Sequence, residues 1–335
     1  MWANRRRYGM NISVIICAYN EKRWDTLVAT ITSIQKQSLP PYEIIQVVDN
    51  NPDLAVRIRA QFSGISVVEN TGPRGLSYAR NVGIVHSTGE VVAFIDDDAM
   101  ANTHWLSQMA KCYTDKHVMG VGGHVTAVWP GGPPVWFPEE FAWVVGCSYR
   151  GLPSHTAPVR NFIGCNMSFR REALMAVSGF NSGLGRVGAH PVGCEETELC
   201  IRVQRYWPDG ILLYEPSAPV QHIIAASRKD VRYFLTRCFF EGRSKAKVAQ
   251  LVGASAGLSS ERSYTMRTLP SGMLLGLRDT IVQRNLHGIA HSCAIFAGLV
   301  CTATGYFSGR IGQRKSIAVP LPTLQESEAV YKGRR

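Results

Sequence analysis

The sequence has no pair of cysteines at Cys-x-x-Cys spacing, although it contains nine cysteines. They are Cys17, Cys112, Cys147, Cys165, Cys194, Cys200, Cys238, Cys293 and Cys301. An odd, scattered set argues against a disulfide framework and against a zinc site. Three arginines near the start are followed by an apolar stretch of only seven residues, 12–18, so we also expect no secretory signal. A reducing, cytoplasmic setting fits both absences.

The glycine-rich loops that hold phosphate in many nucleotide-binding proteins are also missing. The apolar stretch 12–18 is followed by Tyr19-Asn20-Glu21 rather than by Gly-x-Gly-x-x-Gly, and there is no Walker A loop. These absences exclude the Rossmann dehydrogenases and the P-loop proteins. We therefore expect any bound phosphate to be held by a metal ion and by basic side chains.

Acidic residues are fewer than basic ones, 25 against 36, which gives a net charge of +11. Nearly all of the excess lies in residues 228–315, which contain 14 Lys and Arg and four acidic residues. A basic face can bind nucleic acid, an anionic membrane or phosphorylated ligands. No helix-turn-helix, zinc or aromatic RNA-binding pattern accompanies the charge, so we expect no nucleic-acid partner.

Apolar stretches typical of buried strands alternate with helical patterns in the first part of the chain. The expected strands are 12–18, 43–48, 65–68 and 91–95, and the expected helices are 24–37, 54–62 and 76–85. This alternation predicts an α/β fold with a mostly parallel sheet flanked by helices. A chain of 335 residues is long enough for one such domain and an appendage.

Carboxylates directly follow two of these strands. Asp96-Asp97-Asp98 comes after strand 91–95, and Asp49 comes after strand 43–48. Ligands of open α/β sheets bind at this carboxyl edge, so the acids should meet in one crevice. Adjacent carboxylates repel one another unless a cation such as Mg²⁺ or Mn²⁺ neutralises them. The alternative interpretation is a solvated acidic turn.

A second acidic group, Glu195, Glu196 and Glu198, lies in the first turn of an expected helix. The helix macrodipole alone would favour acids there, and a lone histidine such as His222 is more often structural than a ligand. Residues 122–160 are rich in Pro, Gly and Trp, as binding loops often are. The rings there either stack on a sugar or acyl chain or simply pack the loop.

The last part of the chain combines basic charge with apolar helices. Residues 230–251 predict a basic amphipathic helix, and the apolar stretch 286–307 is long enough to span a bilayer. Arginines on both sides of the stretch give no orientation signal. We expect an in-plane or re-entrant membrane helix, and the alternative is a buried pair of soluble helices.

Seven short marks occur in an order that resembles a known enzyme family. They are Ala18-Tyr19-Asn20-Glu21, Asp49, Gly75 to Asn81, Asp96-Asp97-Asp98, Gly164 to Arg170, Glu195-Glu196 and His222. Over residues 11–250 the chain resembles a family 2 glycosyltransferase of the Rossmann-like GT-A fold. The expected parts are a basic tail 1–10, a GT-A catalytic domain 11–228 with a donor half 11–125 and an acceptor half 126–228, a basic helical membrane-associated segment 229–315, and a tail 316–335.

The resemblance implies a nucleotide-diphosphate sugar donor and a divalent metal. The implied donor-binding positions are Ala18, Tyr19, Glu21, Asp49, Arg80, Asp96 and Asp97. Glu21 and Asp49 would hold the nucleoside, while Arg80 would brace the turn near the diphosphate. Asp98 would bind Mg²⁺ or Mn²⁺, and His222 matches a position that completes the metal shell in some relatives.

Glu195-Glu196 matches the acidic pair of the family, in which the second residue is the general base of an inverting reaction. The longer Glu196 replaces the usual aspartate here. A positioned carboxylate that takes the proton of the acceptor hydroxyl contributes roughly 10² to 10⁴ in rate. Trp143 and Asn166 would lie on the acceptor side.

The Gln-x-x-Arg-Trp motif of the processive relatives is absent, so we expect one or a few sugar additions. The expected acceptor is lipid-linked, or another hydrophobic molecule or saccharide, at the inner face of the cell membrane, where the basic segment would bind anionic lipid. The alternative function is a non-catalytic nucleotide-sugar-binding or assembly subunit with the same fold. A nucleotidyltransferase is a more distant third.

Overall fold

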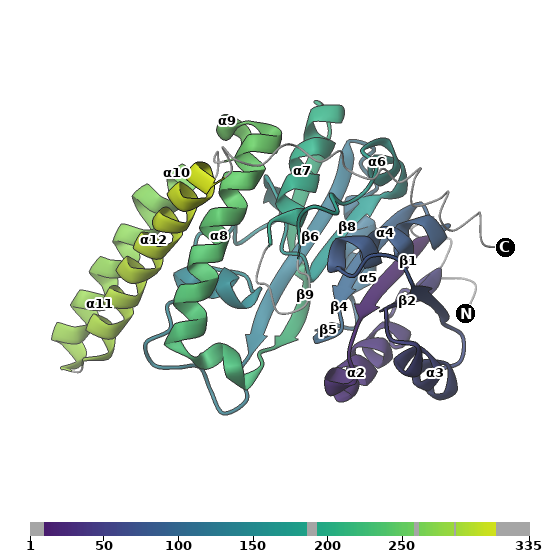
Figure 1. The fold of residues 1–335 in the computed structure, drawn as a ribbon, viewed down its shortest axis with the longest axis horizontal. Helices are drawn as coiled ribbons and strands as arrows, with labels where there is room; N and C mark the ends of the chain where they lie inside the picture. Colours follow the sequence, from purple (N-terminus) through teal and green to yellow (C-terminus); the bar gives the residue numbers. More distant parts are fainter. Residues whose placement is uncertain (1–9, 186–192, 258–260, 285, 313–335) are drawn as a thin grey trace.

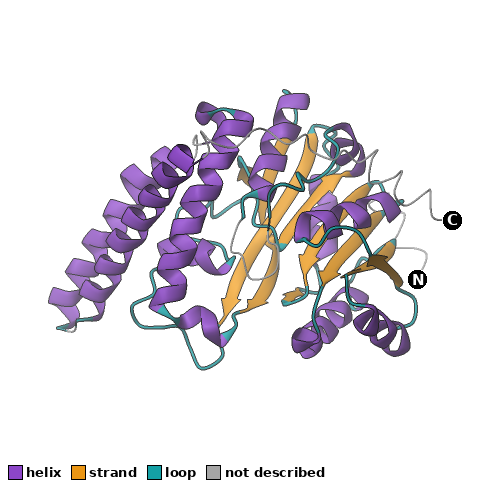
Figure 2. Ribbon diagram, in the orientation of Figure 1, coloured by secondary structure: helices purple, strands orange, loops and turns teal. Residues whose placement is uncertain are grey.

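A computed structural model describes residues 10–185, 193–257, 261–284 and 286–312. A twisted sheet lies at the centre, with helices against both of its faces, and a group of long C-terminal helices packs along one side (Figures 1 and 2). The predicted α/β class is confirmed. The strands are β1 (Ile12–Ala18), β2 (Glu43–Asp49), β3 (Ser66–Asn70), β4 (Val91–Asp96), β5 (Ala99–Ala101), β6 (Val118–Val128), β7 (Ala157–Pro158), β8 (Asn166–Arg170) and β9 (Ile211–Ile223).

The helices of the sheet region connect these strands and cover them. They are η1 (Glu21–Arg23), α2 (Trp24–Gln35), α3 (Pro52–Gln61), α4 (Leu76–His86), α5 (Trp105–Cys112), η2 (Glu139–Val145), α6 (Arg171–Ala176), α7 (Glu195–Tyr206) and η3 (Ala226–Lys229). Alternate side chains of β1 serve the two faces: Val14 belongs to the same core as Leu27 of α2, and Ile15 to the same core as Val82 of α4. The alternation of a strand therefore builds both cores at once.

The order of the strands is β3-β2-β1-β4-β8-β6-β9-β5, with β7 also on β9. The half formed by β3, β2, β1 and β4 is parallel, as predicted, whereas β8 runs antiparallel to β4 and β6. The other half is mixed because the long loop before β8 crosses the carboxyl edge. Asn166, the first residue of β8, consequently pairs with Ile95 near the end of β4.

The parallel half places the ends of its strands side by side. Cys17 of β1 pairs with Asp96 of β4, and Ala18 pairs with Val48 of β2. Asp49 and Asp96 therefore leave the sheet at the same edge, as we predicted from the alternation of strands and helices.

The C-terminal helices are α8 (Val231–Val252), α9 (Ala254–Gly257), α10 (Glu261–Ser263), the π-helical turn η4 (Tyr264–Thr268), α11 (Leu269–Gln283) and α12 (His287–Gly312). Helices α8 and α12 approach each other backbone to backbone at two glycines. A Cβ atom on Gly242 would lie 2.0 Å from the carbonyl oxygen of Thr302, and one on Gly305 would lie 2.0 Å from that of Phe239. Both predicted C-terminal helices therefore exist, and glycines set their distance.

One described helix, His287–Ile311, is long and apolar enough to cross a membrane, with a mean hydropathy of 1.4, and 28% of its most apolar window is buried. Large apolar side chains remain exposed on α11 and α12. They include Leu274, Ile281, Val282, Phe296, Phe307 and Ile311. These two helices are thus only partly covered by the rest of the chain, unlike the buried helix pair that was the alternative prediction.

Candidate active site

A cavity of about 840 Å³ opens at the carboxyl edge of the parallel strands and extends to the C-terminal helices. It brings together most of the residues to which the sequence analysis assigned a role, from segments far apart in the chain. Those that line it are Ala18, Tyr19, Asp49, Arg80, Asp96, Asp97, Asp98, Trp143, Glu195, Glu196 and His222.

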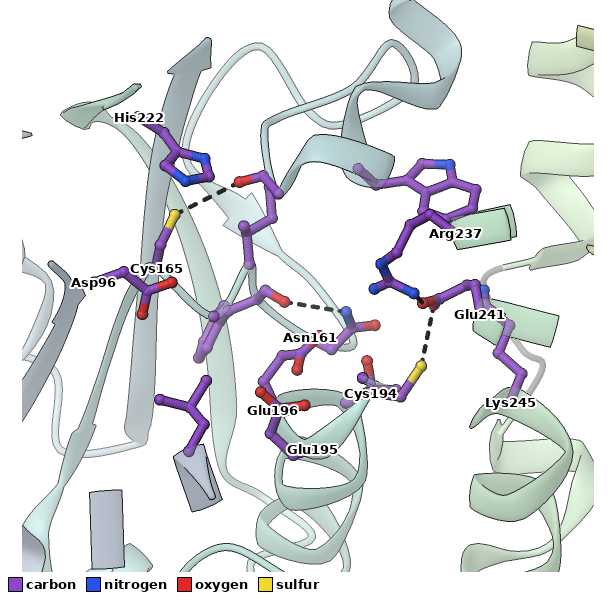
Figure 3. A pocket seen from close by; sticks show the side chains of 18 of the residues that line it. Asp96, Asn161, Cys165, Cys194, Glu195, Glu196, His222, Arg237, Glu241 and Lys245 are labelled. Atoms are coloured by element: carbon purple, nitrogen blue, oxygen red, sulfur yellow. Dashed lines mark hydrogen bonds and ion pairs between the residues drawn. The ribbon is translucent and has the colours of Figure 1, made fainter. Parts of the chain in front are cut away.

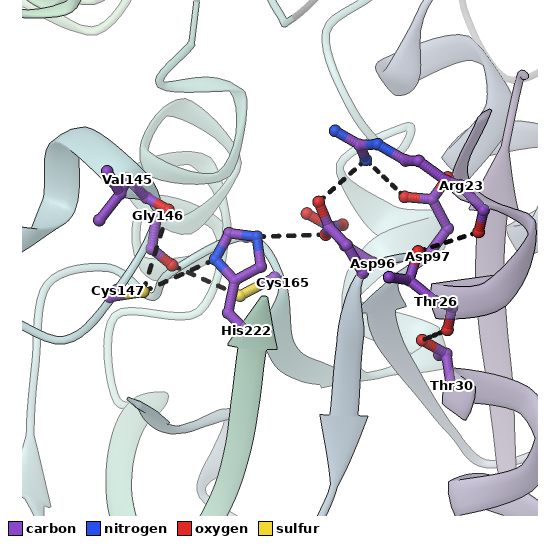
Figure 4. Close-up of polar contacts among 12 residues, drawn as sticks. Arg23, Thr26, Thr30, Asp96, Asp97, Val145, Gly146, Cys147, Cys165 and His222 are labelled. Atoms are coloured by element: carbon purple, nitrogen blue, oxygen red, sulfur yellow. Dashed lines mark hydrogen bonds and ion pairs between the residues drawn. The ribbon is translucent and has the colours of Figure 1, made fainter. Parts of the chain in front are cut away.

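Asp96-Asp97-Asp98, the acid run, is contacted by two side chains from different elements, Arg23 and His222 (Figure 4). Arg23 Nη1 lies 2.6 Å from Asp97 Oδ1 and 3.0 Å from Asp98 Oδ2. On the other side, His222 Nε2 of β9 lies 3.1 Å from Asp98 Oδ1. His222 therefore contacts Asp98, the residue that the resemblance assigns to the metal, whereas no pattern in the sequence singled out Arg23.

The pKa values of Asp97 and Asp98, the two buried carboxyl groups of this run, are shifted in opposite directions. Burial, reinforced by the charge of Asp98, raises the pKa of Asp97 to about 7 despite the contact with Arg23. Burial alone would also raise the pKa of Asp98, but His222 and Arg23 outweigh it and hold that pKa below its usual range. Asp98 is therefore the more firmly ionised of the two.

A divalent cation beside Asp98 and His222 would need further ligands from a bound substrate. Within the ranges that the structure describes, no three His, Cys, Asp or Glu side chains form a cluster that could hold a metal. Asp98 and His222 offer one oxygen and one nitrogen donor next to the cavity. Mg²⁺ commonly binds in this way, through one or two carboxylates together with substrate phosphates.

Arg80 connects the two acidic groups that the sequence analysis treated separately. Its side chain is 2% exposed, and it donates to Glu195 Oε1 at 3.0 Å, to Asp96 Oδ1 at 3.2 Å and to the carbonyl oxygen of Gly164 at 3.0 Å. Burial would lower the pKa of Arg80, but Asp96 and Glu195 raise it on balance. The guanidinium thus stays charged and fixes both carboxylates relative to each other.

In the Glu195-Glu196 pair, Arg80 binds Glu195 and not Glu196. Glu196 lies in the first turn of α7, after Cys194, whose φ of 68° turns the chain into the helix. Burial and the charge of Glu195 raise the pKa of Glu196 to about 8. A half-buried carboxyl group with a raised pKa, facing a cavity, has the properties of a general base.

Two of the residues given a role lie outside the lining of the cavity. Glu21 is exposed and faces Arg57 at 3.5 Å. Asn166 is fully buried: it accepts from Trp105 Nε1 at 2.8 Å and donates to the carbonyl oxygens of His124 and Ala218. The Asn166 side chain thus joins β8 to α5, β6 and β9, which is a structural role, and its place on the acceptor side stays a prediction. Its place in a motif could not distinguish the two.

Trp143 does line the cavity, and it ties the loop of η2 to the C-terminal helices. Its Nε1 donates to the hydroxyl group of Tyr264 at 3.0 Å, and that hydroxyl donates to the carbonyl oxygen of Glu140 at 2.7 Å. The ring therefore has a packing role and a place in the cavity wall at the same time.

Three lining residues of α8, Arg237, Glu241 and Lys245, were not assigned a role from the sequence. The sequence analysis treated their helix as a basic amphipathic surface. Their spacing of four residues places them on one face of the helix, and that face is turned toward Glu196 (Figure 3). The spacing was the available signal, but it does not say which way the face points.

Comparison with known proteins agrees with this geometry. The family description "Glycosyl transferase family 2" matches residues 13–178. A glucosyl-dolichyl phosphate glucuronosyltransferase of Haloferax volcanii is 32% identical over 304 residues, which cover 90% of this chain and 96% of that protein.

Two solved structures share the fold at low identity. A mannosyltransferase of Pyrobaculum calidifontis in complex with GDP-Man and Mn²⁺ has a TM-score of 0.54 at 16% identity, covering 88% of this chain and 87% of that one. GalNAc-T7 with UDP, GalNAc and Mn²⁺ has a TM-score of 0.51 at 17% identity, covering 77% of this chain and 56% of that one. The chain belongs to glycosyltransferase family 2 and has the GT-A fold.

Proposed function

We propose that this glycosyltransferase is an inverting, metal-dependent enzyme that transfers a sugar from a nucleotide-diphosphate donor to a lipid-linked acceptor, without processivity. The observation that carries the proposal is the pairing of two acidic sites on one cavity. Asp98 with His222 offers a place for the metal and diphosphate, while Glu196 offers a base. Arg80 sets the relation between the two sites through Asp96 and Glu195.

Each of these residues then has a distinct task. Asp98 and His222 would hold the divalent cation, which neutralises charge on the diphosphate leaving group when bound. Glu196 takes the proton of the acceptor hydroxyl as that oxygen attacks the donor sugar, because the hydroxyl has a pKa far above 7. Attack from the face opposite the leaving group inverts the anomeric centre. Arg80 keeps Glu195 and Asp96 in place without contacting the reacting atoms.

Support for a lipid-linked acceptor comes from the Haloferax volcanii relative. Its name states that it acts on a glucosyl-dolichyl phosphate and transfers a glucuronosyl group. By this similarity we propose a sugar carried on a polyprenyl phosphate as the acceptor and a uronic acid as a donor sugar to test first. The similarity to this relative covers 90% of this chain and 96% of that protein, so it extends beyond the donor half.

We place the reaction at the cytoplasmic face of a membrane. The exposed apolar side chains of α11 and α12, including Leu274, Ile281 and Phe296, are accompanied by Arg278 and Arg310. Apolar groups that enter the acyl region and cations that meet anionic headgroups are the two components of interfacial binding. We propose that this surface, rather than a spanning helix, holds the protein against its lipid substrate.

The test combines donor binding with transfer. Thermal shift and calorimetry with uridine, guanosine and thymidine diphosphate sugars, each with Mn²⁺, Mg²⁺ or EDTA, should identify one donor that binds only with metal. Asp98→Asn should abolish that metal-dependent binding. The anomeric configuration of the product, read by NMR, then tests inversion. A folded protein that binds a donor but transfers nothing to any acceptor would favour the non-catalytic binding subunit instead.

A further inference from the structure

We propose that the part of the cavity beyond Glu196 is the binding site for the phosphate and the first prenyl units of the acceptor. The ligand chemistry is a phosphate ester attached to an apolar chain. This inference rests on the proposed function, because it assigns the remaining half of the same cavity.

The polar part of this region is a cluster of five charged side chains that all line the cavity: Arg160, Arg237, Glu241, Lys245 and Glu261. Arg237 Nη1 lies 2.9 Å from Glu241 Oε2. Glu261 is shared between Arg160 at 2.8 Å and Lys245 at 2.5 Å. Among these five side chains three cations stand against two carboxylates, and the N–H groups of the cations are the kind of donor that binds a phosphate.

The cluster lies on the acceptor side of the base. In Figure 3, Asp96 and His222 lie on one side of Glu196, and the three α8 residues lie on the other. An acceptor sugar whose hydroxyl group reaches Glu196 would therefore have the donor on one side. The phosphate that links this sugar to its lipid would lie on the other side, near the cluster. The positions of the two charged groups of the reaction, diphosphate and lipid phosphate, match the two charged regions of the cavity.

The far end of the cavity reaches the surface at α12. This helix lines it with the apolar side chains of Leu299, Ala303 and Phe307, next to Thr302 and Tyr306. The side chain of Phe307 is 65% exposed, and it follows Phe296 and Val300, exposed by 60% and 46%, along one side of α12. The mouth of the cavity thus opens on the surface that we place against lipid. A prenyl chain could pass from the cluster into the bilayer without crossing water.

The experiment compares two acceptors that differ only in the phosphate: a glycosyl farnesyl phosphate and the same sugar on farnesol. The whole chain in detergent is used with the donor that the binding screen of the proposed function selects. Lys245→Met should raise KM for the phosphorylated acceptor about tenfold, because one charge-assisted contact is lost, and change KM for the other less than about twofold. Lys245→Arg should keep both KM values within about twofold of the unchanged protein.

A second variant tests the charge balance in the opposite direction. Glu261→Gln removes a carboxylate that competes for Arg160 and Lys245, so KM for the phosphorylated acceptor should fall severalfold. If the cluster served only to hold the helices together, both variants would lower the melting temperature and affect the two acceptors equally. Arg243→Ala is the matched control: it removes a cation from an exposed position of the same helix, outside the cavity, and should change neither KM.

Binding measured without turnover separates this inference from the proposed function. Calorimetry should show farnesyl phosphate binding at least tenfold more tightly than farnesol, with the preference lost in Lys245→Met. This result would support the site even if no sugar were transferred. Equal binding of the two lipids, or displacement of farnesyl phosphate by inorganic phosphate at equal concentration, would overturn the proposal of a lipid phosphate site.

Discussion

Glu196 has a carboxyl group whose pKa is raised to about 8 by burial and by the adjacent Glu195. Only the ionised form can accept a proton from the acceptor, so kcat/KM should rise about tenfold per pH unit below 8 and level off above it. Glu195→Gln removes the neighbouring charge and should move this limb to lower pH. A profile that falls between pH 6 and 8 would contradict the assignment of Glu196 as the base.

Replacing the proposed base separates catalysis from binding. Glu196→Gln keeps the size of the side chain but cannot take the proton, so transfer should fall by roughly 10² to 10⁴. Donor affinity should stay within about twofold, because Asp96, a proposed donor residue, lies on the other side of Arg80 from Glu195. Calorimetry and a transfer assay on the same preparation check both values. Equal loss of binding and transfer would undo the assignment.

Arg80 is the residue whose loss we expect to damage the fold most. Arg80→Met would leave Asp96 and Glu195 without their shared cation, and Glu195 is buried. Removing one partner of a buried ion pair costs roughly 3–5 kcal/mol, which urea denaturation can measure. Arg59→Met, at an exposed pair with Glu69, should cost less than about 1 kcal/mol. Similar losses in the two variants would show that Arg80 is not a structural bridge.

At the scale of elements, the close contact between α8 and α12 depends on glycine. A side chain at Gly305 would meet the backbone of Phe239, which cannot move aside as a side chain can. Gly305→Leu should therefore lower the free energy of unfolding by roughly 1–3 kcal/mol or more, because α8 and α12 must move apart. Ser308→Ala, at an exposed position one turn away, is the control and should be nearly neutral.

The contact between these helices also changes how membrane attachment should be tested. Truncation before α12 would expose Phe141 and Phe234, which pack against Gly298, and would remove the fully buried Ile295. Loss of binding after such a truncation would therefore report unfolding as well as loss of an anchor. Substitutions on the exposed side of α11 and α12 avoid this problem.

For the whole molecule, we expect attachment to anionic lipid through the exposed apolar surface. Leu274→Ser combined with Ile281→Ser removes two side chains that are 67% and 79% exposed, so stability should change little. The partition coefficient onto vesicles that contain phosphatidylglycerol, measured by flotation, should fall about a hundredfold or more, because each of the two side chains would contribute roughly 1.5–3 kcal/mol when buried in the acyl region. Val56→Ser, exposed on α3, is the control. Unchanged flotation of the double variant would contradict this surface.

The sequence by itself determined the fold class and the two acidic groups. Runs of apolar residues and the carboxylates that end them are local features, and parallel strands must bring their ends to one edge. Asp49, Asp96 and Asp98 could be selected in this way because each follows a predicted strand. Glu196 and His222 could be selected only through the family resemblance, since the helix macrodipole alone favours acids where Glu196 lies and nothing local distinguishes His222 from a structural histidine.

Only the tertiary structure decided which side chains meet across elements. Arg23, Arg80 and Lys245 are basic residues on helices, and their directions depend on how those helices pack on the sheet. The same packing turned Asn166 into the core and left Glu21 outside the cavity. The spacing of residues along one helix defines a face, but the partner of that face is set by contacts between segments far apart in the chain.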